Sequence, residues 1–368
     1  MSRYILSIMK NKNLNFGQLL KATRESRGVN QNTLALSTAI DAAVLSKIER
    51  GDRFATRKQV IMLATILEAP INLFLSTWLG EKIYKQLEDE DFGFDALKVA
   101  EKAFEYRTAK TNRSSAEMPA DLKTRLNHID ELKQRWLSNK PLNITQLRKL
   151  DEFFKINYTF ESNRIEGNTL TMQETHLVVN EGITIGGKSM REHLEAINHA
   201  EAIDFVKDIV LRKVDFNERM LKEVHHLILK GIDRDNAGRY RNVPVRIGGS
   251  EFVPAQPYLV PKLMEDVFVF FEENKKTLHP VVLAAEMHER IVTIHPFIDG
   301  NGRTSRLIMN LILLSNGYTI ANLKGDYDSR MRYYSALQKA QVGNDKSEFI
   351  NLIAERTHHS IQEHINMC

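Results

Sequence analysis

The chain has 368 residues, of which 42% are hydrophobic and 27% are charged, and its formal net charge is +4. These values are those of an ordinary soluble globular protein, and the length allows two or three domains. A single cysteine, Cys368, excludes an internal disulfide framework and any cysteine-based zinc site.

The targeting and charge patterns narrow the class of protein further. The first residues, MSRYILSIMKNKN, have too short an apolar run for a signal peptide, and no later run reaches the length of a membrane span. We therefore expect a cytoplasmic protein without a membrane contact. Residues 1–80 carry a net charge of +6 and the remainder −2. This asymmetry suggests a nucleic-acid contact in one module, although a solvated basic surface gives the same count.

Residues 16–76 have the pattern of several short helices. Their apolar residues recur at helical spacing, and Gly28 and Gly51 stand where helices end. The phrase SKIERG, at residues 46–51, resembles the helix-turn-helix of the phage-repressor (XRE-like) type. The resemblance implies a DNA-binding domain over residues 1–80.

By that resemblance, Asp41 to Arg50 form the helix that enters the major groove. Ala42 and Ala43 stand where polar base-reading side chains are common, and alanine can contact only a thymine methyl. We therefore expect four residues to make the DNA contacts: Gln31, Ser46, Lys47 and Arg50. The alternative is a helical bundle used for dimerisation, and a homodimer is expected in either case.

A helical linker region is expected over residues 81–120. Residues 82–110 have a helical pattern, and TAKTNRSSAEMPA at 108–120 is polar and poor in apolar residues. Beyond it, residues 121–368 form a second, helix-rich domain, so the fold class is mainly α. Helical periodicity is clearest in a stripe from Leu147 to Tyr158 and in residues 195–210, 217–229, 260–273 and 281–293.

Strand character is confined to RNVPVRIGGSEFVP at residues 241–254. Val243, Val245 and Ile247 stand at alternate positions before Gly248-Gly249, which predicts a β-hairpin.

The segment HPFIDGNGRTSR, residues 295–306, concentrates chemistry in a loop that leads into a helix. The start of a helix offers free N–H groups and a favourable dipole to an anion, and glycines allow a close approach of the backbone. Arg303 and Arg306 can pair with phosphate oxygens, and Asp299 can supply one ligand to a magnesium ion whose other ligands come from a nucleotide and water. His295 is suited to serve as a general base for a hydroxyl nucleophile. The segment therefore predicts transfer of a phosphorus-centred group from a magnesium–polyphosphate complex.

HPFIDGNGRTSR also resembles the complete signature of the Fic family of protein-modifying nucleotidyltransferases, over about residues 125–355. The resemblance implies an all-helical domain with a β-hairpin flap, and transfer of AMP from ATP, with Mg²⁺, to a Ser, Thr or Tyr hydroxyl of a target protein. It implies His295 as base and Asp299 as metal ligand. The implied ATP-binding residues are Gly300, Asn301, Gly302, Arg303, Thr304, Ser305, Arg306, Tyr333 and Tyr334. The flap, with Ile247, Gly248, Gly249 and Ser250, would clamp an extended target segment as an added strand.

FESNRIEGNTLT, residues 160–171, contains Ser162, Glu166 and Gly167 in the spacing of the family's inhibitory motif. From the residues alone, Ser162 can cap a helical turn, Gly167 can end it, and Glu166 is one solvated carboxylate. The resemblance implies an inhibitory helix near residues 158–168 whose Glu166 pairs with Arg306 and occupies the place of the γ-phosphate. It also leaves open that Glu166 helps to remove AMP from the modified target.

Two alternatives remain at this stage. GITIGGKS, residues 182–189, matches the P-loop formula, but the helical pattern before it favours a chance match over a phosphate loop. The whole chain can also be a transcriptional regulator that senses a nucleotide without transferring AMP, and nothing in the loop selects ATP over GTP or UTP.

Overall fold

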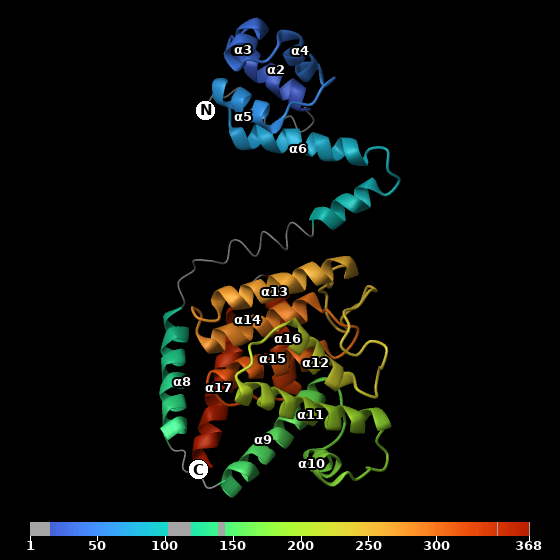
Figure 1. Ribbon diagram of the computed structural model, residues 1–368, viewed down its shortest axis with the longest axis vertical. Coiled ribbons are helices and arrows are strands. Elements are labelled where there is room, and N and C mark those ends of the chain that lie inside the picture. Colours follow the sequence, from blue (N-terminus) through green and yellow to red (C-terminus); the bar gives the residue numbers. More distant parts are fainter. Residues whose placement is uncertain (1–14, 102–118, 139–143, 344, 368) are drawn as a thin grey trace. The chain divides into compact units, whose positions relative to one another are not determined.

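The structure is a computed structural model that describes residues 15–101, 119–138, 144–343 and 345–367. Contacts divide the chain into two compact units, Met1–Ser115 and Ala116–Cys368, here called unit 1 and unit 2 (Figure 1). The linker predicted at residues 108–120 lies outside the described residues except for its last two positions.

Unit 1 contains the short helices that the apolar spacing predicts. Its helices include α2 (Phe16–Ser26), α3 (Gln31–Thr38), α4 (Ala42–Arg50), α5 (Arg57–Ile66) and α6 (Ile71–Leu87), and residues 93–101 are helical as well. Side chains at their N-caps, among them Asn30 and Asp41, accept hydrogen bonds from the first turns. Gly51 ends α4 with a φ of 82°, a conformation that favours glycine.

The last helix of this bundle extends further than the sequence suggests. Residue 80, the expected domain boundary, falls inside α6. Phe74 and Trp78 of this helix are buried in the core of unit 1, and Trp78 Nε1 donates a hydrogen bond of 2.9 Å to the Ala55 carbonyl. Because Phe74 and Trp78 pack in the core of unit 1, α6 belongs to the helical bundle and not to a linker.

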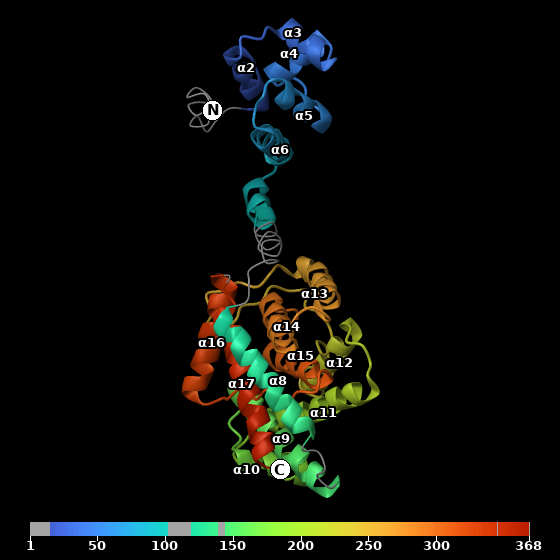
Figure 2. The ribbon, with the colours of Figure 1, turned by 90° about the vertical axis from the view of Figure 1, so that its left-hand side faces the viewer.

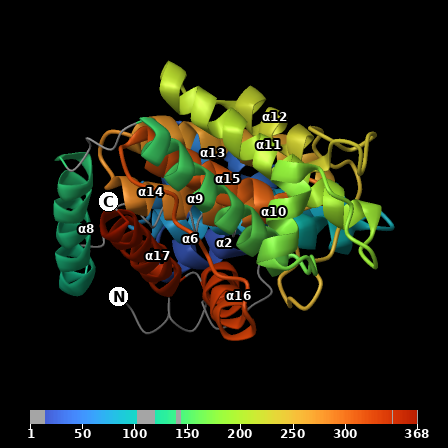
Figure 3. The same ribbon diagram turned by 90° about the horizontal axis from the view of Figure 1, so that it is seen from below.

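Unit 2 is built around two buried helices, α14 (Pro280–Ile294) and α15 (Asn301–Ser315), which contact each other along their length (Figures 1 and 2). Nearly every residue of both helices is buried. The surrounding helices are α8 (Ala120–Ser138), α9 (Ile144–Ile165), α10 (Met172–Glu181), α11 (Met190–Arg212), α12 (Glu218–Leu229), α13 (Val260–Asn274), α16 (Tyr327–Val342) and α17 (Ser347–Asn366). The helix α8 lies beside α17 at one edge of unit 2 (Figure 3).

The mainly helical fold class is confirmed, with one correction. Residues 241–254 form no strands, and neither does any other part of the chain that the structure describes. Around Gly249, whose φ is 75°, the segment makes a turn in which Ser250 N donates to the Ile247 carbonyl. A two-stranded hairpin without a third strand or a packed face is marginal, which explains why alternation alone does not produce one.

One local prediction about a helix also needs correction, whereas the rejection of a P-loop is confirmed. Ser162 does not cap a turn, because it lies inside α9, a continuous helix of 22 residues that continues to Ile165. GITIGGKS joins α10 to α11 and follows a helix rather than a strand, so it is not a P-loop. No helix in the described ranges is long and apolar enough to cross a membrane.

Candidate active site

The segment 295–306 links the two central helices of unit 2 and places its polar groups at the start of α15. His295 ends α14 with a φ of 53°, and Gly300 precedes α15 with a φ of 75°. No side chain caps the first turn of α15. Its leading N–H groups therefore remain available to an anion, as the sequence predicts.

His295 is the base that the sequence proposes. Burial lowers the pKa of His295 and outweighs the opposite effect of the Val292 carbonyl, which lies 3.2 Å from Nδ1. The imidazole is therefore neutral near pH 7, the form that accepts a proton. Its backbone is held by Arg241, whose Nε donates to the His295 carbonyl at 2.7 Å.

Two residues that the sequence reasoning missed fix this loop. The buried Arg241 guanidinium also donates to the carbonyls of Val243 and Ala255, so it joins both ends of the 241–254 segment to the catalytic loop. His225 Nδ1 accepts from Gly238 N at 2.8 Å, which leaves Nε2 to donate to the Asp299 carbonyl at 2.9 Å. Neither residue has a local sequence signal, because all these partners except Val243 are distant in the chain.

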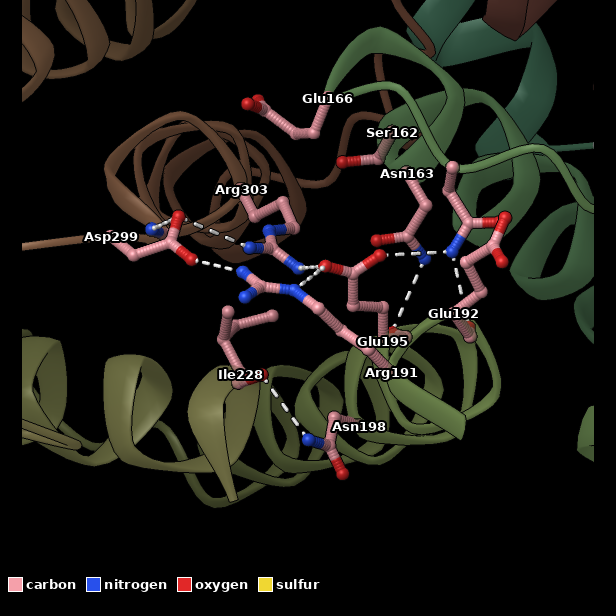
Figure 4. A network of polar contacts seen from close by, with 12 residues as sticks. Ser162, Asn163, Glu166, Arg191, Glu192, Glu195, Asn198, Ile228, Asp299 and Arg303 are labelled. Atoms are coloured by element: carbon pink, nitrogen blue, oxygen red, sulfur yellow. Dashed lines mark hydrogen bonds and ion pairs between the residues drawn. The ribbon is translucent and has the colours of Figure 1, made fainter. Parts of the chain in front are cut away.

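Asp299 is ionised and surrounded by positive groups. Burial alone would raise the pKa of Asp299, but Arg303, the Gly300 N–H and Arg191 together lower it. Asp299 Oδ1 accepts from Gly300 N at 2.6 Å, and Oδ2 lies 2.5 Å from Arg191 Nη2 (Figure 4). An ionised carboxylate at the start of a helix has the chemistry of a magnesium ligand.

Asn301 has a different role from the one that the resemblance implies. Its side-chain oxygen accepts from Phe297 N and its amide donates to the Phe297 carbonyl, both at 2.9 Å. The side chain is buried and closes the loop on itself. Any contribution of this residue to an anion site therefore comes from its backbone.

The three residues after Gly302 are buried within unit 2. Ser305 Oγ donates to the Asn301 carbonyl at 2.7 Å, and Thr304 is fully buried. Arg303 Nη1 lies 3.3 Å from Glu195 Oε1, and its Nη2 lies 3.5 Å from Asp299 Oδ1 (Figure 4). In this state the side chains of the three residues contact the protein, so their contacts with ATP stay predictions.

Arg306 and the predicted inhibitory residues meet as the sequence proposes. The Arg306 guanidinium is buried, and its Nη2 lies 2.7 Å from Glu166 Oε1. It also donates to Ser162 twice, from Nε to Oγ at 3.0 Å and from Nη2 to the carbonyl at 2.8 Å. Burial would lower the pKa of Arg306, but Glu166 and neighbouring tyrosines raise it, so the guanidinium stays charged. Gly167, with a φ of 97°, ends the turn that carries Glu166.

The two adjacent tyrosines lie in different environments. Tyr333 is buried, and its hydroxyl lies 3.1 Å from His288 Nε2, so this side chain packs within the core of unit 2. Tyr334 is 41% exposed and donates to the Ile165 carbonyl at 3.0 Å, next to Glu166. Only Tyr334 therefore has surface available for a nucleotide base. In the flap segment, Gly248 and Gly249 are exposed and Ile247 and Ser250 are half-buried.

The geometry fits a nucleotide phosphate with its metal ion. Arg306 Nη1 is buried without a hydrogen-bond partner. A Cβ placed on Gly302 would lie 3.1 Å from this atom and 2.3 Å from Glu166 Oε1, so the absence of a side chain lets an anionic group, here the Glu166 carboxylate, lie against the start of the helix. No cluster of three or more metal-binding side chains occurs within the described ranges. A single carboxylate, Asp299, is sufficient only if the nucleotide brings further oxygens.

The residues predicted to contact DNA lie on α3 and α4 of unit 1. Lys47 and Arg50 are exposed and Ser46 is half-buried. Gln31 differs from expectation, because its Nε2 donates to Glu49 Oε2 at 3.0 Å. Glu49 is in turn held by the buried Arg24, with 2.6 Å between Arg24 Nε and Oε1. Gln31 therefore serves at least partly to brace α3 against α4.

Comparison with known proteins agrees with this site. Residues 215–313, which include the loop and the flap segment, match the family model "Fic/DOC family". This part of the chain is therefore similar to the Fic domain.

Individual relatives and solved structures show how far along the chain the similarity extends. The chain is 29% identical over 334 residues to protein adenylyltransferase fic-1 of Caenorhabditis elegans, covering 89% of this chain and 64% of that protein. It is 34% identical over 212 residues to protein adenylyltransferase Fic of Drosophila yakuba, covering 57% of this chain and 42% of that protein. The chain thus spans less than two thirds of either relative.

Among solved structures, a Fic domain containing signaling protein from Bacteroides thetaiotaomicron is 29% identical with a TM-score of 0.60, covering 65% of this chain and 96% of that chain. Fic-1 (residues 134–508) from C. elegans is 25% identical with a TM-score of 0.61, covering 91% of this chain and 96% of that chain.

Proposed function

We propose that unit 2 is a protein adenylyltransferase, which transfers AMP from ATP to a Ser, Thr or Tyr hydroxyl of a target protein and is inhibited in cis by Glu166. One observation carries the proposal: the 295–306 loop brings a neutral histidine, an ionised carboxylate and a helix N-terminus together. The names of the relatives in C. elegans and D. yakuba support the same reaction.

Each group in the loop has a place in this reaction. His295 accepts the proton of the target hydroxyl, whose oxygen attacks the α-phosphorus while pyrophosphate leaves. The N-terminus of α15 and Arg306 bind the phosphates. Magnesium, when bound with the nucleotide at Asp299, neutralises charge on the phosphates.

We infer that Glu166 keeps this site inactive by default. Glu166 Oε1 lies 2.7 Å from Arg306 Nη2, so a phosphate that binds this guanidinium must displace the carboxylate. The pairing supports autoinhibition, because one guanidinium edge cannot hold two anions at once. It also leaves Glu166 beside the loop, where it can orient water for removal of AMP.

The experiment is incubation of wild type, Glu166→Gly and His295→Ala with magnesium and either α-labelled or γ-labelled ATP. We expect Glu166→Gly to label itself or a target from α-labelled ATP only, and His295→Ala to label nothing. Equal labelling by Glu166→Gly and His295→Ala would reject the transferase. Label from the γ position would reject AMP as the transferred group. Addition of wild-type protein to AMP-labelled Glu166→Gly then measures AMP removal.

Unit 1 is proposed to bind DNA. The supporting observation is the order of α3 and α4, joined by three residues, with Lys47 and Arg50 exposed on α4. We expect binding to DNA from the protein's own upstream region that weakens steeply with salt. Absent or salt-independent binding would favour the dimerisation bundle, for which the molar mass in solution is the measurement.

The competing function is a transcriptional regulator that only senses a nucleotide. It predicts that ATP alters DNA binding equally in wild type and in His295→Ala, with no labelled protein in either. Substitution of GTP or UTP in the labelling assay tests the choice of base, and a search for the AMP adduct by mass spectrometry identifies the target.

A further inference from the structure

Arg191, near the start of α11, bridges two carboxylates at the edge of the candidate active site. Its Nη2 lies 2.5 Å from Asp299 Oδ2 and its Nε lies 3.2 Å from Glu195 Oε1 (Figure 4). The Arg191 side chain is 57% exposed, so it can leave this position without repacking the core. No sequence motif points to this residue, because the partner loop is 108 positions away.

The contact with Arg191 occupies the atom that a metal ion requires. Asp299 Oδ1 already accepts from Gly300 N at 2.6 Å and lies 3.5 Å from Arg303 Nη2. Oδ2 is the other carboxylate oxygen, and the guanidinium of Arg191 covers it. Magnesium binds oxygen at about 2.0–2.1 Å and carries two positive charges, so an ion bound directly at Oδ2 is repelled by the guanidinium in contact with the same atom.

We propose, on the basis of the proposed function, that Arg191 is the resident counter-cation of Asp299 and that a divalent ion must displace it. Displacement leaves no charge unpaired, because Arg191 retains Glu195 on its own helix. Glu195 Oε2 also accepts from Asn168 Nδ2 at 3.0 Å, in the segment just after Glu166. Arg191 thus sets the concentration of divalent ion at which the site fills.

The test is a titration of full-length protein with Mn²⁺ alone and with Mn²⁺ plus ADP, in which electron paramagnetic resonance measures the free ion. We compare wild type with Arg191→Met, which keeps an apolar stem and removes the charge. Arg212→Met is the matched control, because Arg212 is an exposed arginine of the same helix, paired with Asp208 at 2.8 Å. A partly exposed ion pair is worth about 1 kcal/mol, so we expect Arg191→Met to bind Mn²⁺ about fivefold more tightly.

Three further results complete the test. The gain must disappear in Arg191→Met/Asp299→Asn, and Arg191→Lys, which keeps the charge, must lie closer to wild type. The proposal is overturned if Arg191→Met titrates like wild type and Arg212→Met, or if the gain survives Asp299→Asn. Its failure is separate from failure of the transferase, because Mn²⁺ binding needs no AMP transfer: tighter binding at Asp299 without any labelling by Glu166→Gly would reject only the transferase.

Discussion

Removal of the Glu166 side chain should weaken the protein and strengthen its binding of ATP at the same time. In Glu166→Ala the buried Arg306 guanidinium loses the carboxylate 2.7 Å from its Nη2. Loss of one partner of a buried ion pair costs about 3–5 kcal/mol. Here the Glu166 side chain is 33% exposed, and Ser162 still accepts two hydrogen bonds from the guanidinium. We therefore expect a loss of about 2 kcal/mol in the free energy of unfolding without nucleotide.

The same free energy is what ATP must overcome in the wild type. If a phosphate takes the place of the carboxylate, the affinity of Glu166→Ala for Mg–ATP should exceed that of wild type by about 30-fold, the equivalent of 2 kcal/mol. Calorimetric titration measures the affinity and urea unfolding measures the stability. Saturating ATP should restore much of the stability that the variant loses, because the ligand binds only the folded state.

The control is Glu152→Ala, an exposed glutamate of α9, the helix that leads to Glu166, whose Oε1 accepts from Asn180 Nδ2 at 2.6 Å. Glu152→Ala should change neither the affinity for ATP nor the stabilisation that bound ATP provides. A stability loss in Glu166→Ala without a gain in affinity of at least about threefold would show that the pair is structural and does not block the phosphate site.

Three other changes test separate parts of the structure. Gly302→Ala should destabilise the protein by about 1–3 kcal/mol in thermal unfolding and weaken ATP binding, since its Cβ would lie 2.3 Å from Glu166 Oε1. In Glu166→Gly, AMP transfer should persist at pH 6.5 and fall only below it, because burial lowers the pKa of His295 from its ordinary 6.5 and the neutral base survives to lower pH. An acidic limb centred above 6.5 would contradict this. Lys47→Gln should weaken DNA binding and reduce the slope of log affinity against log salt by about 1; an unchanged slope would remove Lys47 from the contact.

Reasoning from the residues predicted what depends on neighbours in the chain and missed what depends on distant partners; the pair of Glu166 with Arg306 was proposed only through the family resemblance. The loop before α15 follows from local rules, since Gly300 and the apolar pattern of α14 and α15 define where one helix ends and the next begins. The side chain of Asn301 turned inward to Phe297, and Gln31 turned to Glu49, because a closer hydrogen-bond partner was available in the folded chain. Composition cannot show which partner a polar side chain selects.

The absent hairpin has the same explanation, whereas the helices α8 and α17 do not depend on distant partners. Their apolar residues recur at helical spacing, which is a local signal. Alternation in residues 241–254 was a true feature of the sequence, but strands form only where another strand is available for pairing. Arg241 binds backbone carbonyls at both ends of that segment and so replaces a sheet as the element that holds it.

The charges of the candidate site allow entry of a nucleotide only by exchange. Three guanidinium groups and three carboxylates pair with one another there: Arg191, Arg303 and Arg306 with Asp299, Glu195 and Glu166. A free phosphate meets an Arg306 that is already neutralised, and a free metal ion meets an Asp299 that is already neutralised. If both proposals hold, Mg–ATP brings an anion for Arg306 and a cation for Asp299 in one molecule, so each displaced side chain leaves a charge that the ligand replaces. The two ion pairs together should therefore disfavour binding of ATP without metal, and of metal without ATP, more strongly than either ion pair does alone. Disruption of both pairs in Glu166→Ala/Arg191→Met should weaken this coupling between metal binding and ATP binding.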